Sequence, residues 1–433
     1  MSEFLPRLNP WWADPSAIDQ QRLVAAAIRR KHRLLFDPLS PGWYIIVGPR
    51  QVGKTTMLLL MIRALLRRGV EPRRILFVTG EVITDFRELL SILGRGEEVV
   101  VLDEVTFVPG WERALKVAID QGWLDKRTVY ASGSTTAFLR RETFPGRPIR
   151  FLEMLPLDFR RFCLLFGSLR LRKRVATAKS YDDLYPLLDE LNRLFAHYLR
   201  CGGFPRAMYE EMEEGGIRDE TYEAVVNWIL GDVLKLGRSR ETAIAILRAL
   251  LRTYGTRFSL NALRKELAIG SHRTVREYLE LLSDLFVIRQ YFQYRRSTPL
   301  LRRERKVYFT DPFLLHAIEH LLFGASIVDE SLVVEGVVAE HLRRAHPPPA
   351  AVGFYVGPHR ETDFQILPVR LGVEVKWRRH VHPTDFPNPR RFHTRLLLSR
   401  TTYDPNSPTP IIPTPLYLAT LRIPSQIPYK LLS

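Results

Sequence analysis

The sequence predicts an α/β fold with a parallel sheet, followed by a helical region and a smaller C-terminal α/β region. Three observations predict it. Residues 44–57 run from an apolar strand through a glycine-bounded loop into an apolar helix. Strand-like apolar runs alternate with helical patterns up to residue 134, as in a doubly wound sheet. Acids or small polar residues follow these runs, where parallel strands would gather them at one edge of the sheet.

The loop at residues 48–55 has the spacing G-x-x-x-x-G-K-T of a P-loop. Its two glycines let backbone N–H groups turn toward phosphate oxygens, and the following helix adds its unpaired N-terminal donors. We expect Lys54 to reach the β- and γ-phosphates and the Thr55 hydroxyl to bind Mg²⁺. The predicted cofactors are ATP and Mg²⁺, and the predicted nucleotide-binding residues are Gly48, Pro49, Arg50, Gln51, Val52, Gly53, Lys54, Thr55 and Thr56.

Two later strands predict the rest of the catalytic site. Residues 98–104, EVVVLDE, predict a buried strand that ends in two acids. Asp103 is expected to hold the magnesium ion, and Glu104 to orient and polarise the attacking water. Residues 128–134 predict another strand, whose Ser132 would lie near the γ-phosphate unless it is an ordinary strand-end serine. Arg147, in a loop beyond this strand, is a candidate arginine finger toward its own or a neighbouring phosphate.

The other N-terminal elements complete the alternation. The spacing predicts a helix over 16–32, a strand over 75–78, and helices over 85–93 and 111–121. The adjacent Trp11 and Trp12 precede the first of these helices and are expected to anchor their segment onto the domain. From residue 151 to about 234 the pattern is helical, which predicts a lid bundle over 151–238.

Composition restricts the class of partner. The 433 residues include 64 Lys and Arg against 47 Asp and Glu, a net charge of +17, which favours nucleic acid or, less often, an anionic membrane surface. The alternative is basic charge spread for solubility. The 2 cysteines lack metal-ligand spacing, which favours a reducing cytoplasm. The N-terminus is too acidic and too interrupted by proline for a signal peptide, and no apolar run approaches about 18 residues, so we expect a soluble protein without a membrane partner.

Residues 239–305 predict a winged helix-turn-helix. Three helical patterns, the second and third capped by Ser259 and Ser271, precede a strand-like run at 286–294. Basic side chains on the third helix and after the wing are expected to contact DNA phosphates, and a winged helix that contacts only protein is the alternative. The predicted DNA-binding residues are His272, Arg273, Arg276, Arg302 and Arg303.

Residues 306–433 predict a small α/β domain with an acidic site. Glu374 and Lys376 lie two residues apart on one face of a strand, and a preceding hairpin strand brings Asp363 beside them. Glu335, on a predicted helix, is a nearby third acid. Carboxylates that hold a second divalent cation, Mg²⁺ or Mn²⁺, beside a lysine and an activated water are suited to phosphodiester hydrolysis.

In this order the motifs resemble an archaeal and bacterial family of AAA+ ATPases. The segments that carry the resemblance, between about Trp11 and Arg400, are GPRQVGKTT from Gly48, LDEV from Leu102 with Trp111, SGS from Ser132, GR at Gly146, LPL from Leu155, GGFP from Gly202, KVYFTD from Lys306, and Asp363 with EVK from Glu374. The resemblance implies an AAA+ domain (1–150), a helical lid (151–238), a winged helix (239–305) and a PD-(D/E)XK, restriction-endonuclease-like domain (306–433). It also implies a sensor at Ser132 and a finger at Arg147. The acid that the family often places after the second strand is shifted and replaced by Thr79-Gly80-Glu81, so that position receives no role.

These features predict an ATP-hydrolysing, DNA-associated protein with a metal-dependent nuclease-like domain. The alternative is a nucleotide-switched module that binds DNA or protein and cuts no phosphodiester. A signalling or defence ATPase that acts on a protein target is a third hypothesis, less favoured because of the basic clusters. A homo-oligomer and a protein partner stay open.

Overall fold

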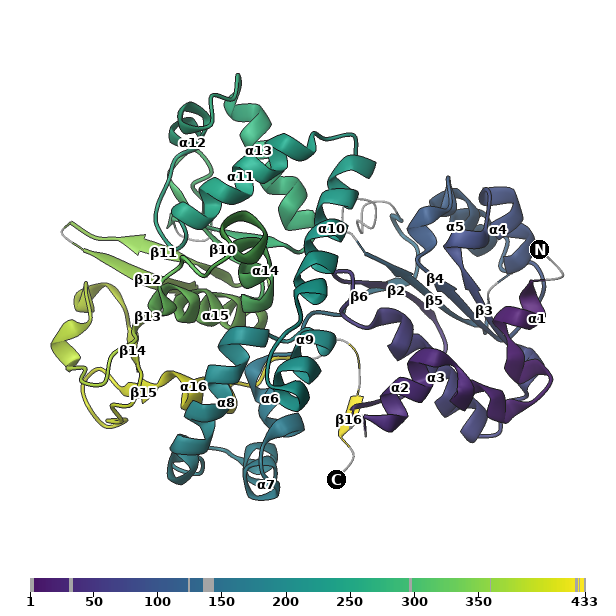
Figure 1. Cartoon of the computed structure of the whole chain (residues 1–433), viewed down its shortest axis with the longest axis horizontal. Helices are drawn as coiled ribbons and strands as arrows, with labels where there is room; N and C mark the ends of the chain where they lie inside the picture. Colours follow the sequence, from purple (N-terminus) through teal and green to yellow (C-terminus); the bar gives the residue numbers. More distant parts are fainter. Residues whose placement is uncertain are drawn as a thin grey trace. The chain divides into compact units, whose positions relative to one another are not determined.

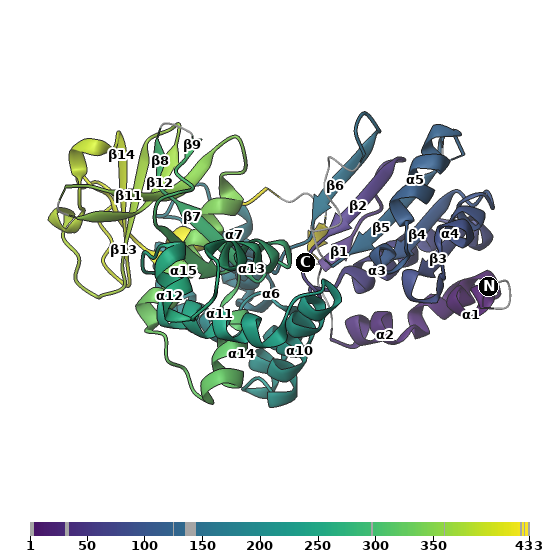
Figure 2. The same cartoon turned by 90° about the horizontal axis from the view of Figure 1, so that it is seen from above.

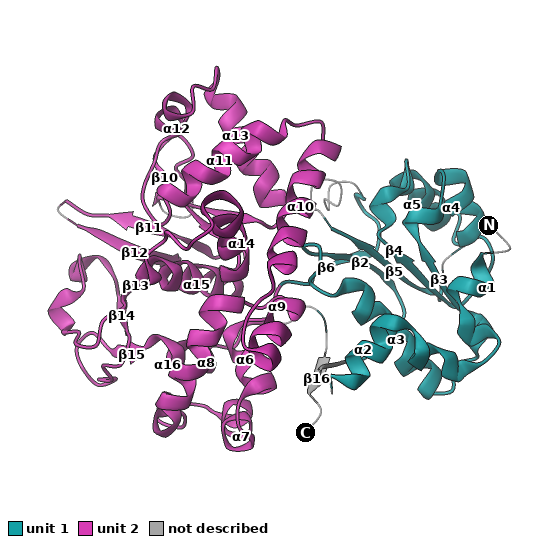
Figure 3. Cartoon of the chain, in the orientation of Figure 1, with its two compact units in different colours: residues 1–155, 425–433 teal, residues 156–424 magenta. Residues whose placement is uncertain are grey.

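The computed structural model of the chain (Figures 1 and 2) describes residues 4–30, 34–123, 125–134, 144–295, 298–358, 360–424, 427 and 429–431. It divides into two compact units, residues 1–155 with 425–433 and residues 156–424 (Figure 3). Among the described residues, no helix has the length and apolar character that a membrane crossing requires.

The first unit is built on a five-stranded, fully parallel sheet with the strand order β3-β4-β5-β2-β6. Every residue of β2, β4 and β5 is buried, as expected for central strands covered on both faces. Figure 1 shows α2 and α3 on one side of this sheet and α4 and α5 on the other. The strands are β2 (Trp43–Val47), β3 (Ile75–Thr79), β4 (Val99–Asp103), β5 (Thr128–Gly133) and β6 (Ile149–Glu153), and the helices are α1 (Leu5–Leu8), α2 (Arg22–Arg29), α3 (Lys54–Arg67), α4 (Phe86–Leu93) and α5 (Trp111–Asp120). The parallel α/β sheet predicted from the sequence is confirmed.

The N-terminal segment covers the outer edge of β3. The Asn9 side chain accepts a hydrogen bond from the Phe77 N–H (2.6 Å) and donates one to the Phe77 carbonyl (2.9 Å), much as a neighbouring strand would. The indole N–H groups of Trp11 and Trp12 both donate to the Ile75 carbonyl. The expected anchoring role of the two tryptophans is confirmed.

Two local predictions in this unit differ from the structure. Residues 151–153, expected to begin the helical lid, instead belong to β6 (Ile149–Glu153), the edge strand that pairs with β2. This strand is short and most of its residues are half-buried, so its sequence lacks the alternation of apolar and polar residues that would predict a strand. The described part of the helix predicted over 16–32 is a 3₁₀ helix, Pro15–Gln20, capped by Asp14 and followed by α2, and residues 31 and 32 lie outside the described residues.

The second unit has one continuous hydrophobic core that extends from Phe159 to Ala419. The regions predicted as lid, winged helix and C-terminal domain all contribute to this core. The helices are α6 (Phe159–Phe166), α7 (Leu169–Thr177), α8 (Leu188–Cys201), α9 (Pro205–Tyr209), α10 (Asp219–Lys235), α11 (Arg240–Arg252), α12 (Leu260–Glu266), α13 (His272–Asp284), α14 (Pro312–Phe323), α15 (Glu330–Ala345) and α16 (Thr414–Thr420).

The strands of the second unit form one larger mixed sheet and two small pairs. In the five-stranded sheet β11-β12-β13-β14-β15, the first three strands are antiparallel and the last three are parallel. The pair β7–β10 follows the three helices α11 to α13, and β8 pairs with β9. The strands are β7 (Ile288–Phe292), β8 (Tyr294–Arg295), β9 (Thr298–Pro299), β10 (Arg305–Phe309), β11 (Ala351–Val356), β12 (Glu361–Leu367), β13 (Leu371–Lys376), β14 (Thr394–Ser399) and β15 (Ile411–Pro413).

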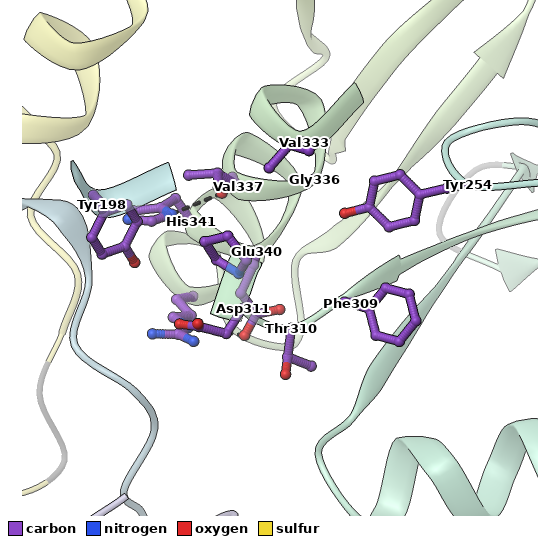
Figure 4. A pocket seen from close by; sticks show the side chains of 12 residues that line it. Tyr198, Tyr254, Phe309, Thr310, Asp311, Val333, Gly336, Val337, Glu340 and His341 are labelled. Carbon is purple, nitrogen blue, oxygen red and sulfur yellow. Dashed lines mark hydrogen bonds and ion pairs between the residues drawn. The ribbon is translucent and has the colours of Figure 1, made fainter. Parts of the chain in front are cut away.

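A buried carboxylate connects distant segments of the second unit beside a cavity of about 10 Å³ (Figure 4). Asp311 caps α14 by accepting the Phe313 N–H, and its other oxygen accepts the Gly203 N–H, both at 2.9 Å. A Cβ on Gly202, whose φ is +58°, would lie 1.7 Å from an Asp311 carboxylate oxygen. Gly202 is therefore required by the approach of Asp311, whereas Gly203 is required by Leu157, whose carbonyl oxygen would lie 2.0 Å from a Cβ there.

The stability of this connection should depend on pH. Burial raises the pKa of Asp311 from 3.8 to about 7, although the two backbone N–H donors oppose the shift. The folded chain therefore binds the proton more strongly than the unfolded chain, and this contribution to stability falls as pH rises from about 4 to about 7. Asp311→Asn, which cannot titrate, should show a melting temperature that approaches or overtakes the parent's across this range. A parent-minus-variant difference that is constant with pH would contradict this assignment.

Candidate nucleotide-binding site

The strand order brings three predicted residues together at one edge of the first sheet. Because β5 lies between β2 and β4, Ser132 at its carboxyl end sits between the P-loop helix and Asp103. The Asp103 carboxylate accepts one hydrogen bond from the Thr55 hydroxyl (2.7 Å) and another from the Ser132 hydroxyl (2.6 Å). Burial raises the pKa of Asp103, and the two hydroxyl donors oppose that shift. Thr55 and Asp103 are thus placed to share one Mg²⁺ ion, since both present oxygen ligands.

Lys54 is buried at the start of α3. Its ammonium group donates to the carbonyl oxygens of Gly48 (2.9 Å) and Pro49 (3.0 Å) and lies 3.6 Å from a Glu104 carboxylate oxygen. Burial lowers the pKa of Lys54, while the charges of Glu104 and Asp103 oppose this shift. A buried cation held by the loop's own carbonyls is well placed to bind phosphate oxygens with little reorganisation.

Glu104 has a constrained backbone and one buried carboxylate oxygen that is open to a polar partner. It adopts the left-handed region (φ +48°), and its N–H donates to the Ser132 hydroxyl at 2.9 Å. Its Oε2 atom is buried and accepts no hydrogen bond within the described part of the chain. A buried carboxylate oxygen without a donor can accept a hydrogen bond from water.

Gly80 fixes the backbone of Glu104, a role that sequence reasoning missed. A Cβ at Gly80 would lie 2.4 Å from the Glu104 carbonyl oxygen, so no larger residue fits there. The substituted Thr79-Gly80-Glu81 segment, which received no role from the sequence, therefore contacts the site through its glycine. The glycine after strand β3 was the available signal, because strand-end glycines often mark close backbone approach.

The loop glycines have two different structural reasons. Gly53 has φ +99° and precedes α3, which agrees with the predicted turn, and Gln51 is also left-handed at φ +62°. Gly48 is required by a neighbour instead, since a Cβ there would lie 2.0 Å from the Met154 carbonyl oxygen. The remaining predicted loop residues line the same turn, with Val52 buried, Thr56 half-buried, and the Arg50 guanidinium 5.6 Å from the Phe107 ring centre.

Arg147 lies near the amino ends of the strands, whereas the P-loop lies at their carboxyl ends. It precedes β6, whose first residue, Ile149, pairs with Trp43 at the start of β2. Its guanidinium forms an ion pair with Asp120 at 2.7 Å. At about 3.3 Å per strand residue, Arg147 is roughly 20 Å from the phosphate loop of its own chain. We therefore do not expect Arg147 to reach the phosphates of its own chain, and its finger role stays a prediction.

The basic residues predicted to contact DNA lie on the surface of the second unit. His272, Arg273 and Arg276, at the start of α13, are exposed, as are Arg302 and Arg303 before β10. Arg273 pairs with Glu277 on its own helix at 2.9 Å, whereas the other three arginines form no ion pair with the residues that the structure describes. The predicted caps Ser259 and Ser271 are confirmed. The winged-helix assignment itself stays a prediction.

The structure also brings together the four residues of the predicted nuclease-like site. Asp363 and Glu374 face each other on β12 and β13, with the Asp363 N–H donating to Glu374 (3.1 Å) and the Val375 N–H donating to Asp363 (2.9 Å). Lys376 donates to Glu374. Burial, together with the charges of Glu335 and Glu374, raises the pKa of Asp363 well above its usual range.

A second lysine, Lys306, also lies among these acids. Lys306 of β10 lies with its ammonium 3.0 Å from a Glu335 oxygen and 2.5 Å from a Glu361 oxygen. Within the described ranges, no group of three or more His, Cys, Asp or Glu side chains is arranged to hold a metal ion. The donor set therefore does not fit the predicted second divalent cation. Sequence reasoning missed Lys306 here, because the lysine ends a run of basic residues that was interpreted as a DNA-contacting surface.

Comparison with known proteins agrees with the first unit's geometry. Residues 40–163 match the family model described as an AAA domain, and residues 192–324 match a domain of unknown function, DUF8612. An uncharacterized protein of Haemophilus influenzae is 25% identical over 373 residues, which cover 79% of this chain and 84% of that protein.

The chain also has a low similarity to several solved structures. The ORC1 protein of Aeropyrum pernix, solved in complex with DNA, shares 15% identity over 71% of this chain and 92% of its own, with a TM-score of 0.29. A RuvB variant of Thermotoga maritima shares 19% identity over 71% of this chain and 95% of its own, with a TM-score of 0.28. Scores this low carry no argument about this chain, so the assignment rests on the family model and the site. Residues 40–163 match an AAA domain, and they contain the P-loop of the candidate site.

Proposed function

We propose that the chain binds and hydrolyses ATP at the P-loop site of its first unit. The observation that carries the proposal is the Asp103 carboxylate, which the hydroxyls of Thr55 and Ser132 hold at 2.7 and 2.6 Å beside the buried Lys54. Three groups at this end of the strands support the proposal: Thr55 and Asp103 as a candidate magnesium-binding pair, Lys54 as a candidate phosphate-binding cation, and the Glu104 Oε2 atom, which accepts no hydrogen bond among the described residues. Phosphoryl transfer to water needs these groups, since its catalysis is mostly positioning and charge stabilisation.

Each residue has a separate task in this proposal. Thr55 and Asp103 hold Mg²⁺, which when bound would neutralise charge on the β- and γ-phosphates. Lys54 binds phosphate oxygens and stabilises the charge of the transition state. Glu104 accepts a hydrogen bond from the attacking water and orients it toward the γ-phosphate, and Ser132 fixes both Asp103 and the backbone of Glu104.

A direct assay tests the proposal. The full chain, incubated with ATP and Mg²⁺, should release phosphate, and chelation of Mg²⁺ by EDTA should stop that release. ATP bound tightly by the chain without any phosphate released, over a range of temperatures and with or without duplex DNA, would contradict hydrolysis and leave a nucleotide-binding switch.

DNA association is a second candidate function, favoured by the exposed basic side chains of α13 and the segment before β10. Arg276, Arg302 and Arg303 have no acidic partner among the described residues, so their charge is available to phosphates. Neutralising phosphates releases counterions, which makes such binding steeply salt-dependent. Cleavage is left out of this proposal, because the metal that it requires would compete with Lys306.

Replacing Arg273, Arg276, Arg302 and Arg303 with alanine should weaken duplex DNA binding and flatten its salt dependence. Each lost phosphate contact should lower the slope of log K against log salt by about 1. Fluorescence anisotropy over a salt series measures both quantities. A matched control removes four exposed basic residues of the helical region, Arg170, Lys173, Arg174 and Arg193. Equal losses in the two variants would show that net charge, rather than this surface, binds DNA.

A further inference from the structure

Lys306 is among the most buried charged residues of the second unit, with a side chain 5% exposed. It lies on β10, whose partner is β7, and its ammonium contacts carboxylates from two other elements, Glu335 on α15 and Glu361 on β12. The Tyr308 hydroxyl, two residues along the strand, also donates to Glu335. One lysine thus joins β10, α15 and the β12–β13 hairpin.

The charges of this cluster balance without a metal ion. Glu361 also pairs with Arg257 at 2.9 Å, and Glu374 pairs with Lys376. With Lys306 at Glu335, each of these three carboxylates has a cationic partner, and Arg257 also lies 3.3 Å from the exposed Glu304. Asp363 is left over, and the raised pKa of its carboxyl favours the neutral form. Burial opposes the charge of Lys306, but the carboxylates of Glu335 and Glu361 outweigh it and raise the lysine's pKa.

We propose that Lys306 is the built-in cation of this acid cluster and takes the place that a divalent metal ion would need. Glu335 and Glu361 each place an oxygen within 3.0 Å of the ammonium nitrogen. A metal ion at that point would clash with the lysine and be repelled by its charge. If Lys306 is replaced by a shorter, uncharged residue, Glu335 and Glu361 form a site suited to Mn²⁺ or Mg²⁺. Asp363 lies nearby as a third oxygen donor.

The melting temperature of the nucleotide-free full chain, measured with and without Mn²⁺, tests this proposal. Mn²⁺ should change the melting temperatures of the parent and of Asp363→Asn by the same amount, because no metal binds at the acid cluster of either protein. A rise in melting temperature that both proteins share belongs to the Thr55–Asp103 pair. Lys306→Met should melt roughly 5 to 10 °C lower, because it leaves buried carboxylates unpaired. Mn²⁺ should restore part of that loss by binding the folded state.

Two further variants separate a cation site from a general loss of stability. Lys306→Met/Glu335→Gln removes one cation and one anion together, so it should be more stable than Lys306→Met and respond less to Mn²⁺. Lys265→Met replaces an exposed lysine on α12 and should change neither the melting temperature nor its response to the metal.

Two outcomes would overturn the proposal. In the first, Mn²⁺ raises the melting temperature of the parent but not that of Asp363→Asn, which would place a metal beside Lys306. The other is a folded Lys306→Met chain whose melting temperature does not respond to Mn²⁺. The parent and Asp363→Asn comparison decides the first point even where Lys306→Met fails to fold.

Discussion

Lys54→Ala should lower the affinity of the chain for ATP by at least about 100-fold, which corresponds to about 3 kcal/mol. Lys54 is the cation at the loop, buried and held by the Gly48 and Pro49 carbonyls at 2.9 and 3.0 Å. Charge-assisted bonds to phosphate are the strongest contacts that the site offers, and alanine removes them. Isothermal titration with ATP and Mg²⁺ measures the change.

Lys116→Ala is the matched control, because Lys116 lies in the same unit on α5 and contacts the Phe144 ring instead of the loop. It should bind ATP like the parent. The melting temperature of Lys54→Ala must also be measured, since removal of a buried lysine leaves two loop carbonyls without their donor. Near-parental ATP affinity in a folded Lys54→Ala chain would exclude the predicted phosphate contact.

Glu104→Gln should reduce ATP hydrolysis by about 100-fold or more while the dissociation constant for ATP changes little. The amide keeps the size of the side chain but loses the negative charge that orients and polarises water. Because the backbone of Glu104 is held by Ser132 and Gly80, the substitution should leave the loop geometry intact. Glu81→Gln, an exposed acid beside Gly80, is the control and should hydrolyse ATP at the parental rate.

The nucleotide site could be predicted from sequence because its parts are local. A phosphate loop is contiguous, and Asp103 and Ser132 each end an apolar run, so parallel strands bring them to one edge whatever the exact strand order. The structure adds what those patterns lack, namely that β5 lies between β2 and β4 and that Asp103 joins the two hydroxyls.

The features that could not be predicted depend on contacts between distant segments. Gly48 is explained by Met154, and Gly80 by Glu104, because each contact brings backbone from another strand end to the glycine. Arg147 follows a loop glycine and is a candidate finger in the sequence, but the pairing of β6 with β2 shows that it lies before the amino end of β6, away from the phosphate loop.

Lys306 illustrates the same limit in the second unit. In the sequence it belongs to a basic run with Arg302, Arg303 and Arg305, which is typical of a solvent-exposed or DNA-binding surface. In the structure β10 is fully buried, so its lysine must find carboxylates, and it finds those of α15 and β12. Charge alone could not distinguish an exposed cation from a buried one.

We expect Glu104 to make the nucleotide-binding site hydrolytic, and a single-turnover measurement tests this role. The chain, in excess over labelled ATP and with Mg²⁺ present, is followed until the bound nucleotide is ADP, for the parent and for Glu104→Gln side by side. The parent should convert its bound ATP to ADP, whereas the variant should retain ATP at equal occupancy. Conversion at the same rate in both proteins would contradict the assignment of the water-orienting role to Glu104.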